Sequence, residues 1–283
     1  MAKTSSANTI TKVPGMDAAD AMMRPAPEWR KNRLIYSIEG QTKTQKSSFG
    51  LWGPPPVMLF DIDHRVEGVV ELFEDGTRTG KAKIIRRHYV QVPELAPMAK
   101  KLDEAAKKSA QFEWDKLVQL YGIALESSLK AGGIRTIVMD DITELYDLRL
   151  ISEFGRTQAI QQRDRGAANF DMLKLIDMGK DYAATVIWIS KVKEEWGTNA
   201  AGENKPTGQW IPDGYKRLRQ TVQVALRAQI NSKKRFEIEV LSSGLNAETN
   251  GLKYTADDWR ASGPFAWVSH EQVDGSIPDD WVE

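Results

Sequence analysis

The sequence predicts a single α/β domain: a mainly parallel, doubly wound sheet flanked by helices, with antiparallel strands at its C-terminal end. Short, continuously apolar runs, typical of strands covered on both faces, alternate with longer segments of helical periodicity. The 283 residues are 41% hydrophobic, enough for one sizeable core without a metal or disulfide to hold it. We expect the domain over residues 29–273, a flexible Ser/Thr/Ala/Pro-rich arm at 1–28 and an acidic tail at 274–283.

In the first third of the chain, two apolar runs at residues 33–37 and 57–61 are expected to be buried strands. Between them, a polar loop leads into a short helix at 47–52, which a Gly-Pro-Pro-Pro run ends. Residues 66–92 alternate β-branched and charged residues around an Asp-Gly pair. This pattern predicts a strand region with a hairpin.

The middle of the chain continues the alternation of helix and strand. Residues 93–130 carry apolar side chains at helical spacing, and two glycines end this helix before an apolar strand at 134–139. Residues 151–180 are predicted to be mostly helical, with a first part rich in arginine and glutamine. Another buried strand is expected at 185–189.

The last part of the chain contains a long polar stretch. Residues 194–214 are rich in Gly, Asn and Thr and are predicted to form a loop without regular structure, which at this length is usually functional or disordered. Two further strands are expected at 221–228 and 235–241, joined by residues 229–234.

Composition excludes several classes of protein. Lys and Arg total 39, as do Asp and Glu, so the chain is not a histone-like basic protein. The absence of cysteine excludes disulfide scaffolds, thiolate zinc sites and cysteine nucleophiles, and three histidines disfavour a His-rich metal centre. No run approaches the roughly 18 apolar residues of a membrane helix, and the N-terminus lacks the apolar core of a signal peptide. We expect no membrane association and a cytoplasmic location.

A polar loop after the first expected strand matches the phosphate-binding pattern G-x-x-x-x-G-K-[ST], except that Gln45 replaces the second glycine. Such a loop curls backbone N–H groups around phosphates at a helix N-terminus. Lys46 would reach the β- and γ-phosphates of ATP, and the Ser47 hydroxyl would bind Mg²⁺. We expect ordinary right-handed helical dihedrals at Gln45. The residues expected to bind the nucleotide are Gly40, Gln41, Thr42, Lys43, Thr44, Gln45, Lys46, Ser47 and Ser48.

Carboxylates at the ends of two expected strands provide a second, independent pattern. Asp140 ends an apolar strand, as does the acid that holds Mg²⁺ and its water beside a nucleotide. Asp61 and Asp63 end the strand after the phosphate loop, and period-2 alternation places them on one side, where an acid can align an attacking water. Lys191 follows the strand at 185–189, where a polar residue can sense the γ-phosphate. The alternative interpretations are a chance polar turn and solvated strand ends.

These blocks together resemble the RecA-like recombinase core, most closely the small phage-encoded RecA-like nucleotide-binding proteins of single-strand annealing and recombination. The resemblance covers residues 33–241 and rests on the phosphate loop and on the blocks at 59–64, 136–140, 186–196 and 212–215. It implies a RecA-like P-loop fold, with ATP and Mg²⁺ as cofactors. It also implies an ATPase that acts on single-stranded DNA in the host cytoplasm.

The resemblance implies roles for individual residues as well. Lys46, Asp63 and Lys191 are the implied catalytic residues, although the family has a glutamate where Asp63 stands and usually Gln, Asn or His where Lys191 stands. These departures, like Gln45, bear on the hydrolysis rate more than on nucleotide binding. Ser47 and Asp140 are the implied metal ligands.

The family also contacts DNA and neighbouring subunits. The residues implied to bind single-stranded DNA are Arg156, Arg163, Arg165, Trp196 and Trp210, the tryptophans by stacking on bases. The residues implied to reach a neighbour's γ-phosphate are Lys233, Lys234 and Arg235. The implied partners are other copies of the chain, in a filament or ring, and a single-strand-binding protein. A solvated helix face, a partner-protein contact and a plain hairpin tip are the alternatives.

Three functions remain open at this stage. The first is a recombination, annealing or repair ATPase. The second is a P-loop ATPase that drives a protein partner in another phage process, such as packaging or replication. The third is a nucleotide-binding oligomeric protein with little hydrolysis. A Rossmann dehydrogenase is disfavoured because the first strand turn lacks G-x-G-x-x-G.

Overall fold

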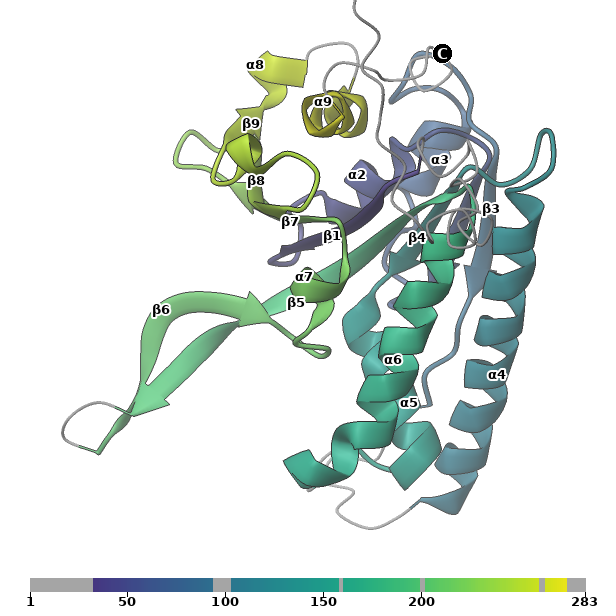
Figure 1. The fold of residues 1–283 in the computed structure, drawn as a ribbon, viewed down its shortest axis with the longest axis vertical. Helices are drawn as coiled ribbons and strands as arrows, with labels where there is room; N and C mark the ends of the chain where they lie inside the picture. The colour runs from purple at the N-terminus through teal and green to yellow at the C-terminus, as the bar shows by residue number, and fades with distance from the viewer. Residues whose placement is uncertain (1–32, 94–102, 158–159, 199–201, 260–262, 274–283) are drawn as a thin grey trace, which may run out of the picture.

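The computed structural model describes residues 33–93, 103–157, 160–198, 202–259 and 263–273. The expected arm at 1–28 and tail at 274–283 lie outside these residues. The described part of the chain is an α/β structure whose strands form one mixed sheet of nine strands, flanked by helices on both faces (Figure 1). No helix among the described residues is long and apolar enough to cross a membrane.

Six strands of the sheet run parallel, in the order β3-β2-β4-β5-β1-β7. Two more strands, β8 and β9, extend the sheet antiparallel beyond β7, as expected for the C-terminal strands. The bounds of the parallel strands are Ile35–Gly40 (β1), Val57–Asp61 (β2), Ile85–Tyr89 (β3), Thr136–Asp140 (β4), Thr185–Thr198 (β5) and Val224–Ile230 (β7). β8 spans Phe236–Ser243 and β9 spans Lys253–Thr255.

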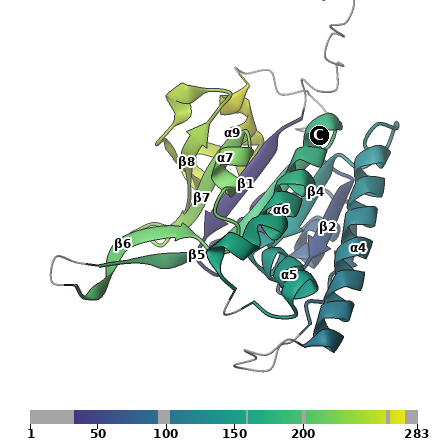
Figure 2. The ribbon, with the colours of Figure 1, turned by 60° about the horizontal axis from the view of Figure 1, so that its bottom comes forward.

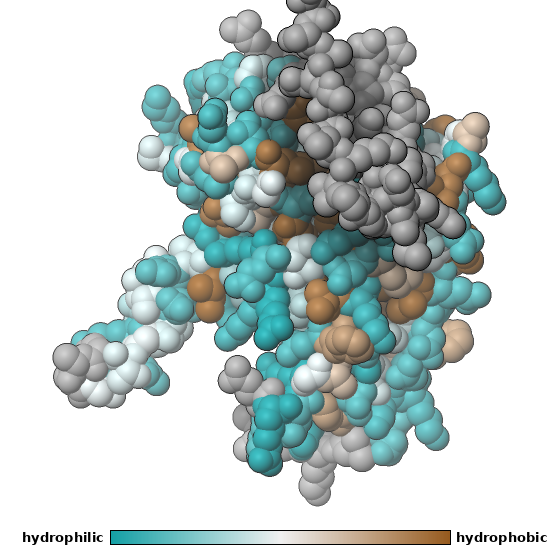
Figure 3. Space-filling view, in the orientation of Figure 1, coloured by the Kyte–Doolittle hydropathy of each residue, from teal (hydrophilic) through white to brown (hydrophobic). Residues whose placement is uncertain are grey.

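The second half of β5 leaves the sheet and pairs antiparallel with β6 (Asn204–Pro212) in a two-stranded ribbon that projects from the body (Figure 2). The expected loop at 194–214 is therefore wrong. Few of its side chains are apolar, so the periodicity that marks a half-buried strand is missing although the backbone pairs regularly. The ribbon surface is mostly hydrophilic or of intermediate hydropathy (Figure 3).

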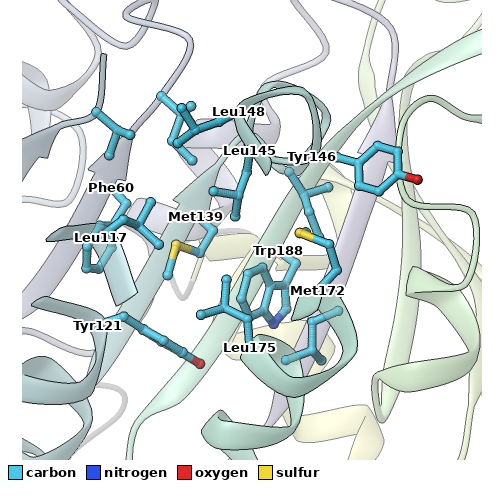
Figure 4. Close-up of a cluster of buried hydrophobic side chains, with 14 of the residues drawn as sticks. Phe60, Leu117, Tyr121, Met139, Leu145, Tyr146, Leu148, Met172, Leu175 and Trp188 are labelled. Atoms are coloured by element: carbon cyan, nitrogen blue, oxygen red, sulfur yellow. The ribbon is translucent and has the colours of Figure 1, made fainter. Parts of the chain in front are cut away.

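Three long helices cover one face of the sheet: α4 (Glu104–Ser127), α5 (Ile142–Phe154) and α6 (Gly166–Met178). Their apolar side chains meet those of the central strands around Trp188, which contacts Tyr121 edge to face (Figure 4). The opposite face is covered by α2 (Lys46–Leu51), α3 (Val70–Glu74) and α9 (Gly263–Gln272). The two short helices α7 (Leu218–Thr221) and α8 (Ala256–Trp259) complete the described elements of this type.

Two further expectations are corrected. Residues 66–92 do not form a hairpin, because Val66, Val70 and Phe73 follow one helical face into the core and the single strand β3 runs parallel to β2. The helix expected at 151–180 is two helices. The first, α5, already begins at Ile142 and ends at Phe154, because the next residue, Gly155, has a φ of 61° and forms the left-handed cap that stops a helix.

Candidate phosphate-binding site

A cavity of about 330 Å³ lies where the parallel strands β1, β2 and β4 end and β5 leaves the sheet. Strand register explains why residues distant in sequence meet here: Gly40 is opposite Lys191, and Asp61 is opposite Asp140. Open α/β sheets bind ligands at this edge. The cavity is lined by Thr42, Lys43, Thr44, Gln45, Lys46, Ser47, Ser48, Asp63, Arg65, Val66, Val69, Asp140, Asp141 and Lys191. It thus contains most of the residues predicted for the nucleotide.

The loop between β1 and α2 wraps around the ammonium group of Lys46. The Lys46 Nζ donates hydrogen bonds to the carbonyl oxygens of Gly40, at 2.8 Å, and Gln41, at 2.7 Å. Burial lowers the pKa of Lys46 despite the nearby carboxylates. Gly40 is required at the start of the loop, because a Cβ there would lie 2.3 Å from the carbonyl oxygen of Ala228 on β7. The loop therefore holds a buried cation at the N-terminus of a helix.

Gln45 does not have the helical dihedrals expected from the sequence. Its φ and ψ are 59° and 24°, in the left-handed region that favours glycine, and this costs roughly 1 kcal/mol for another residue. Lys43 also has a positive φ, of 66°. The Gln45 side chain accepts a hydrogen bond from Arg78 at 3.1 Å, a partner that sequence reasoning missed. Gln45 therefore has a backbone conformation that favours glycine, at the position where the sequence pattern has glycine.

Ser47 and Asp140 form a hydroxyl–carboxylate pair in the cavity. The Ser47 Oγ donates a short hydrogen bond to the Asp140 Oδ2. Burial raises the pKa of Asp140 to about 7, and the bond from Ser47 opposes this rise. These two oxygens fit Mg²⁺, which takes few protein ligands and completes its octahedron with water and phosphate oxygens. No cluster of three or more acidic or histidine side chains that could hold a metal occurs in the described part of the chain.

Lys191 lies among three carboxylates. Its Nζ is 2.6 Å from Glu144, 3.3 Å from Asp141 and 3.4 Å from Asp63. Burial lowers the pKa of Lys191, but these carboxylates outweigh burial and raise it above its ordinary value. Lys191 is therefore a fixed positive charge at the rim of the cavity. Sequence reasoning missed Glu144, whose backbone N–H bonds the capping Asp141 side chain at the start of α5.

Asp61 and Asp63 do not lie on one side of a strand as expected. The strand ends at Asp61, and the backbone N–H groups of the next two residues both turn to the carbonyl oxygen of Asp140, at 2.6 and 3.3 Å. Asp63 consequently faces the cavity, 3.1 Å from Arg65. Asp61 is fully buried and contacts Arg87 on β3 at 3.3 Å. Of the two acids, Asp63 alone lines the cavity.

The residues predicted to bind DNA are not gathered in one place. Trp196 and Trp210 are on the two strands of the ribbon, and their side chains are 63% and 39% exposed. Arg165 precedes α6 and lines a second cavity, whereas Arg163 is 79% exposed and pairs with Asp164. Arg156 follows the cap of α5, in the segment between the two helices.

Lys233, Lys234 and Arg235 lie in the tight turn between β7 and β8, close to the connection expected at 229–234. The Asn231 side chain accepts hydrogen bonds from two backbone N–H groups of this turn. Arg235 pairs with Asp257 and lines a third cavity of about 530 Å³ in its own chain. That cavity shares Gln45 and Ser48 with the phosphate-loop cavity and includes apolar side chains, among them Trp52, Phe236 and Pro264.

A buried cluster below the loop was also missed. Glu39, the residue before Gly40, is 3% exposed and accepts two hydrogen bonds from Arg219, both at 2.6 Å, and two from Arg227, at 2.8 and 3.0 Å. Arg227 also donates to the backbone carbonyl of Trp210 at 3.2 Å, at the base of the ribbon. Glu39 is 180 and 188 positions away from these two arginines in sequence, so only the folded chain brings them together.

No model of a known protein family matches the sequence, and no curated protein matches it.

Proposed function

We propose that the chain binds a nucleoside triphosphate with Mg²⁺ at the phosphate loop and hydrolyses it, as a RecA-like ATPase that acts on single-stranded DNA. One observation carries the nucleotide part of this proposal: a buried ammonium group, at the start of a helix, lies beside a hydroxyl–carboxylate pair at the end of a parallel strand. This combination supplies both the cation that meets phosphate oxygens and the ligands of their metal ion.

Each residue of the cavity has a role in this proposal. Lys46 exchanges the loop carbonyls for the β- and γ-phosphates, and Ser47 and Asp140 hold Mg²⁺, which neutralises phosphate charge when bound. Asp63 faces the cavity and orients the attacking water. Lys191, 3.4 Å from Asp63, supplies a positive charge to the oxygens of the γ-phosphate.

The third cavity accommodates the nucleoside. Since it shares Gln45 and Ser48 with the phosphate-loop cavity, a nucleotide whose phosphates lie in the loop extends directly into it. The Phe236 and Trp52 side chains offer apolar contacts to a base, and Arg78 stands at the boundary between the two cavities.

A second candidate function is an ATPase that drives a protein partner. The ribbon favours this alternative, because its two lysines are already paired: Lys193 with Asp213 at 2.6 Å, and Lys205 with Glu203 at 2.8 Å. Exposed tryptophans on such a ribbon suit a protein surface as well as a base. DNA stimulation of ATP hydrolysis separates the two candidates.

Three measurements test the proposal: the affinity for a fluorescent ATP analogue, the rate of ATP hydrolysis, and the oligomeric state from a sizing column. We expect Lys46→Ala to lose 10²-fold or more in affinity and Asp63→Asn to bind normally while hydrolysing about 10²-fold more slowly. Lys108→Ala, which removes an exposed charge on α4, is the matched control. Unchanged ATP affinity in Lys46→Ala would overturn the phosphate-loop assignment. Turnover without any response to single-stranded DNA would favour the protein partner, and a wild type that binds ATP without turnover would leave a binding protein.

A further inference from the structure

A second cavity, of about 430 Å³, lies beside the proposed nucleotide site between α5, the start of α6 and the turn that follows the ribbon. Its lining residues are Tyr146, Ile160, Arg165, Asn169, Gly214, Tyr215, Lys216 and Arg217. Three of these are cationic and none is a carboxylate. In a chain of zero net charge, such a local excess of positive charge indicates an anionic ligand.

Arg165 supports this interpretation independently of the charge count. Its side chain is half-buried and interacts with the Tyr146 hydroxyl and the Asp147 carboxylate, but its Nε is a buried donor without a hydrogen-bond partner among the described residues. An unpaired buried donor is costly, and a phosphate oxygen in the cavity would satisfy it. Lys216 and Arg217 are exposed at the mouth of the same cavity, so an anion that continues beyond the cavity would meet them in turn.

The arrangement suits a nucleotide chain better than a small anion, because two of the three cations, Lys216 and Arg217, are exposed at the mouth of the cavity. The rings of Tyr146 and Tyr215 lie 6.3 Å apart and 48° from parallel in the cavity wall. The Tyr146 hydroxyl donates to the Asn169 Oδ1 at 2.9 Å, which leaves the Asn169 amide group as a further donor. Because Tyr146 and Tyr215 are only 4% and 2% exposed, they form a rigid wall rather than a surface for stacked bases. The backbone of a strand is therefore the part of a nucleic acid that this cavity fits.

We propose that this cavity binds the phosphodiester backbone of a single-stranded nucleic acid, with Arg165, Lys216 and Arg217 as its phosphate contacts. The inference rests on the proposed function for its choice of partner. Of the arginines predicted to contact DNA it keeps Arg165, and it adds Lys216 and Arg217 at the base of the ribbon. The turn that carries Lys216 and Arg217 follows β6 directly, so a strand held there passes the exposed Trp210.

Thr143, at the start of α5, joins this cavity to the nucleotide site. Its Oγ1 donates to the carbonyl oxygen of Asp213, at 3.2 Å, in the turn that leads to Lys216. The same Oγ1 accepts from the backbone N–H of Lys191, also at 3.2 Å. Thr143 therefore links the backbone of Lys191 to the turn that holds the nucleic acid. A bound strand that displaces this turn would shift the backbone at Lys191, which gives DNA a route to stimulate hydrolysis.

The test is fluorescence anisotropy of a labelled oligo-dT across a salt titration, with the full chain. We expect the double variant Lys216→Ala/Arg217→Ala to bind at least tenfold more weakly, with a salt slope reduced by about 1.4, or roughly 0.7 for each lost phosphate contact. The control is Lys108→Ala/Lys130→Ala, which removes the same charge from exposed positions on and just after α4. Competition by inorganic phosphate separates a small-anion site from a strand site.

Equal affinity of the double variant and its control would overturn the inference, while ATP binding lost only in Lys46→Ala would keep the nucleotide proposal intact. A wild type that binds no oligonucleotide, or releases it at micromolar inorganic phosphate, would also overturn it. Selective loss of oligonucleotide binding, with normal ATP affinity and unchanged unfolding free energy, would support it.

Discussion

The two halves of β5 are one continuous strand in two different environments. Residues 185–190 lie at the centre of the sheet, paired with β4 and β1, and are fully buried. Residues 192–198 extend beyond the sheet, pair with β6 in the projecting ribbon and are half-exposed or exposed (Figure 2). The change occurs at Lys191, the residue that faces the proposed nucleotide site.

One strand thus has two roles: its first half is part of the core, and its second half forms an exposed surface. The buried half fixes the position of the site, because side chains on both its faces pack into the two halves of the core. The ribbon half contributes little to the core, and an isolated two-stranded ribbon is at best marginally stable in water. The cost of keeping two tryptophans exposed on it is consistent with a surface reserved for a partner.

The largest expected effect compares one tryptophan from each half. Trp188→Ala should lower the free energy of unfolding by about 3–5 kcal/mol, because Trp188 is fully buried against Tyr121. Trp196→Ala should change it by no more than about 0.5 kcal/mol, since its side chain is 63% exposed. Urea denaturation followed by circular dichroism measures both.

A gentler substitution controls for the loss of volume. Trp188→Phe keeps an aromatic ring and removes an indole N–H that has no partner among the described residues, so it should cost clearly less than Trp188→Ala. Equal destabilisation by Trp188→Ala and Trp196→Ala would break the comparison, because it would mean that the ribbon is part of the cooperative core.

The second prediction concerns the link between the two regions. Glu39→Gln should cost about 3 kcal/mol of unfolding free energy, because it leaves the guanidinium groups of Arg219 and Arg227 without their buried counter-charge. Arg227 also donates a hydrogen bond to the carbonyl oxygen of Trp210. The rate of amide hydrogen exchange in Glu39→Gln should therefore increase over wild type more in the ribbon than in the core. Denaturation and hydrogen exchange measure the two effects.

Glu126→Gln is the matched control for this prediction, because it neutralises an exposed glutamate on α4. Ribbon exchange that stays at its wild-type rate in Glu39→Gln would show that the ribbon does not depend on the Glu39 cluster. The buried and projecting halves of β5 would then be energetically independent.

The sequence predicted the buried strands well and the projecting ribbon poorly. The strand at 57–61 has the predicted bounds, and those around 35–40, 136–140 and 185–190 were found within a few residues, because each is a continuous apolar run. The ribbon was taken for a loop because pairing between two polar strands leaves no hydrophobic pattern. The short helix α3 was taken for a strand because its charged and β-branched residues also alternate locally.

The candidate site shows a similar limit. Lys46, Ser47 and Asp140 were found because a local motif and a strand end predict their positions. The sequence did not predict the charged partners around the site, because they depend on packing between distant segments. These partners are Glu144 beside Lys191, Arg78 beside Gln45 and the arginines around Glu39. The left-handed backbone of Gln45 was missed because a glutamine ordinarily favours right-handed helical dihedrals.

The smallest expected effect concerns Asp147, on α5 at the border between the buried half of β5 and the ribbon. Its charge interacts with Lys191, where the buried half ends, and with Asp213, just after the ribbon. Burial raises the pKa of Asp147 to about 6, and the charges of Glu144 and Asp213 add to the rise. In the unfolded chain, an aspartate titrates near pH 4. Between these values the native state holds a proton that the unfolded state has released. The free energy of unfolding should therefore fall as the pH rises from about 4 to about 6.

Asp147→Asn should remove this part of the pH dependence, because the amide stays neutral as the protonated acid does. We expect the variant to match the wild type near pH 4 and to be more stable by about 1–2 kcal/mol at pH 8, after allowance for the partial exposure of the side chain. Other buried acids, such as Asp140 and Asp141, titrate in both proteins, so the difference between the two unfolding curves isolates Asp147. Asp115→Asn, at an exposed position on α4, is the control. A difference that stays constant from pH 4.5 to 8 would contradict the prediction, and would mean that Asp147 is as well solvated at this border as an acid on the ribbon.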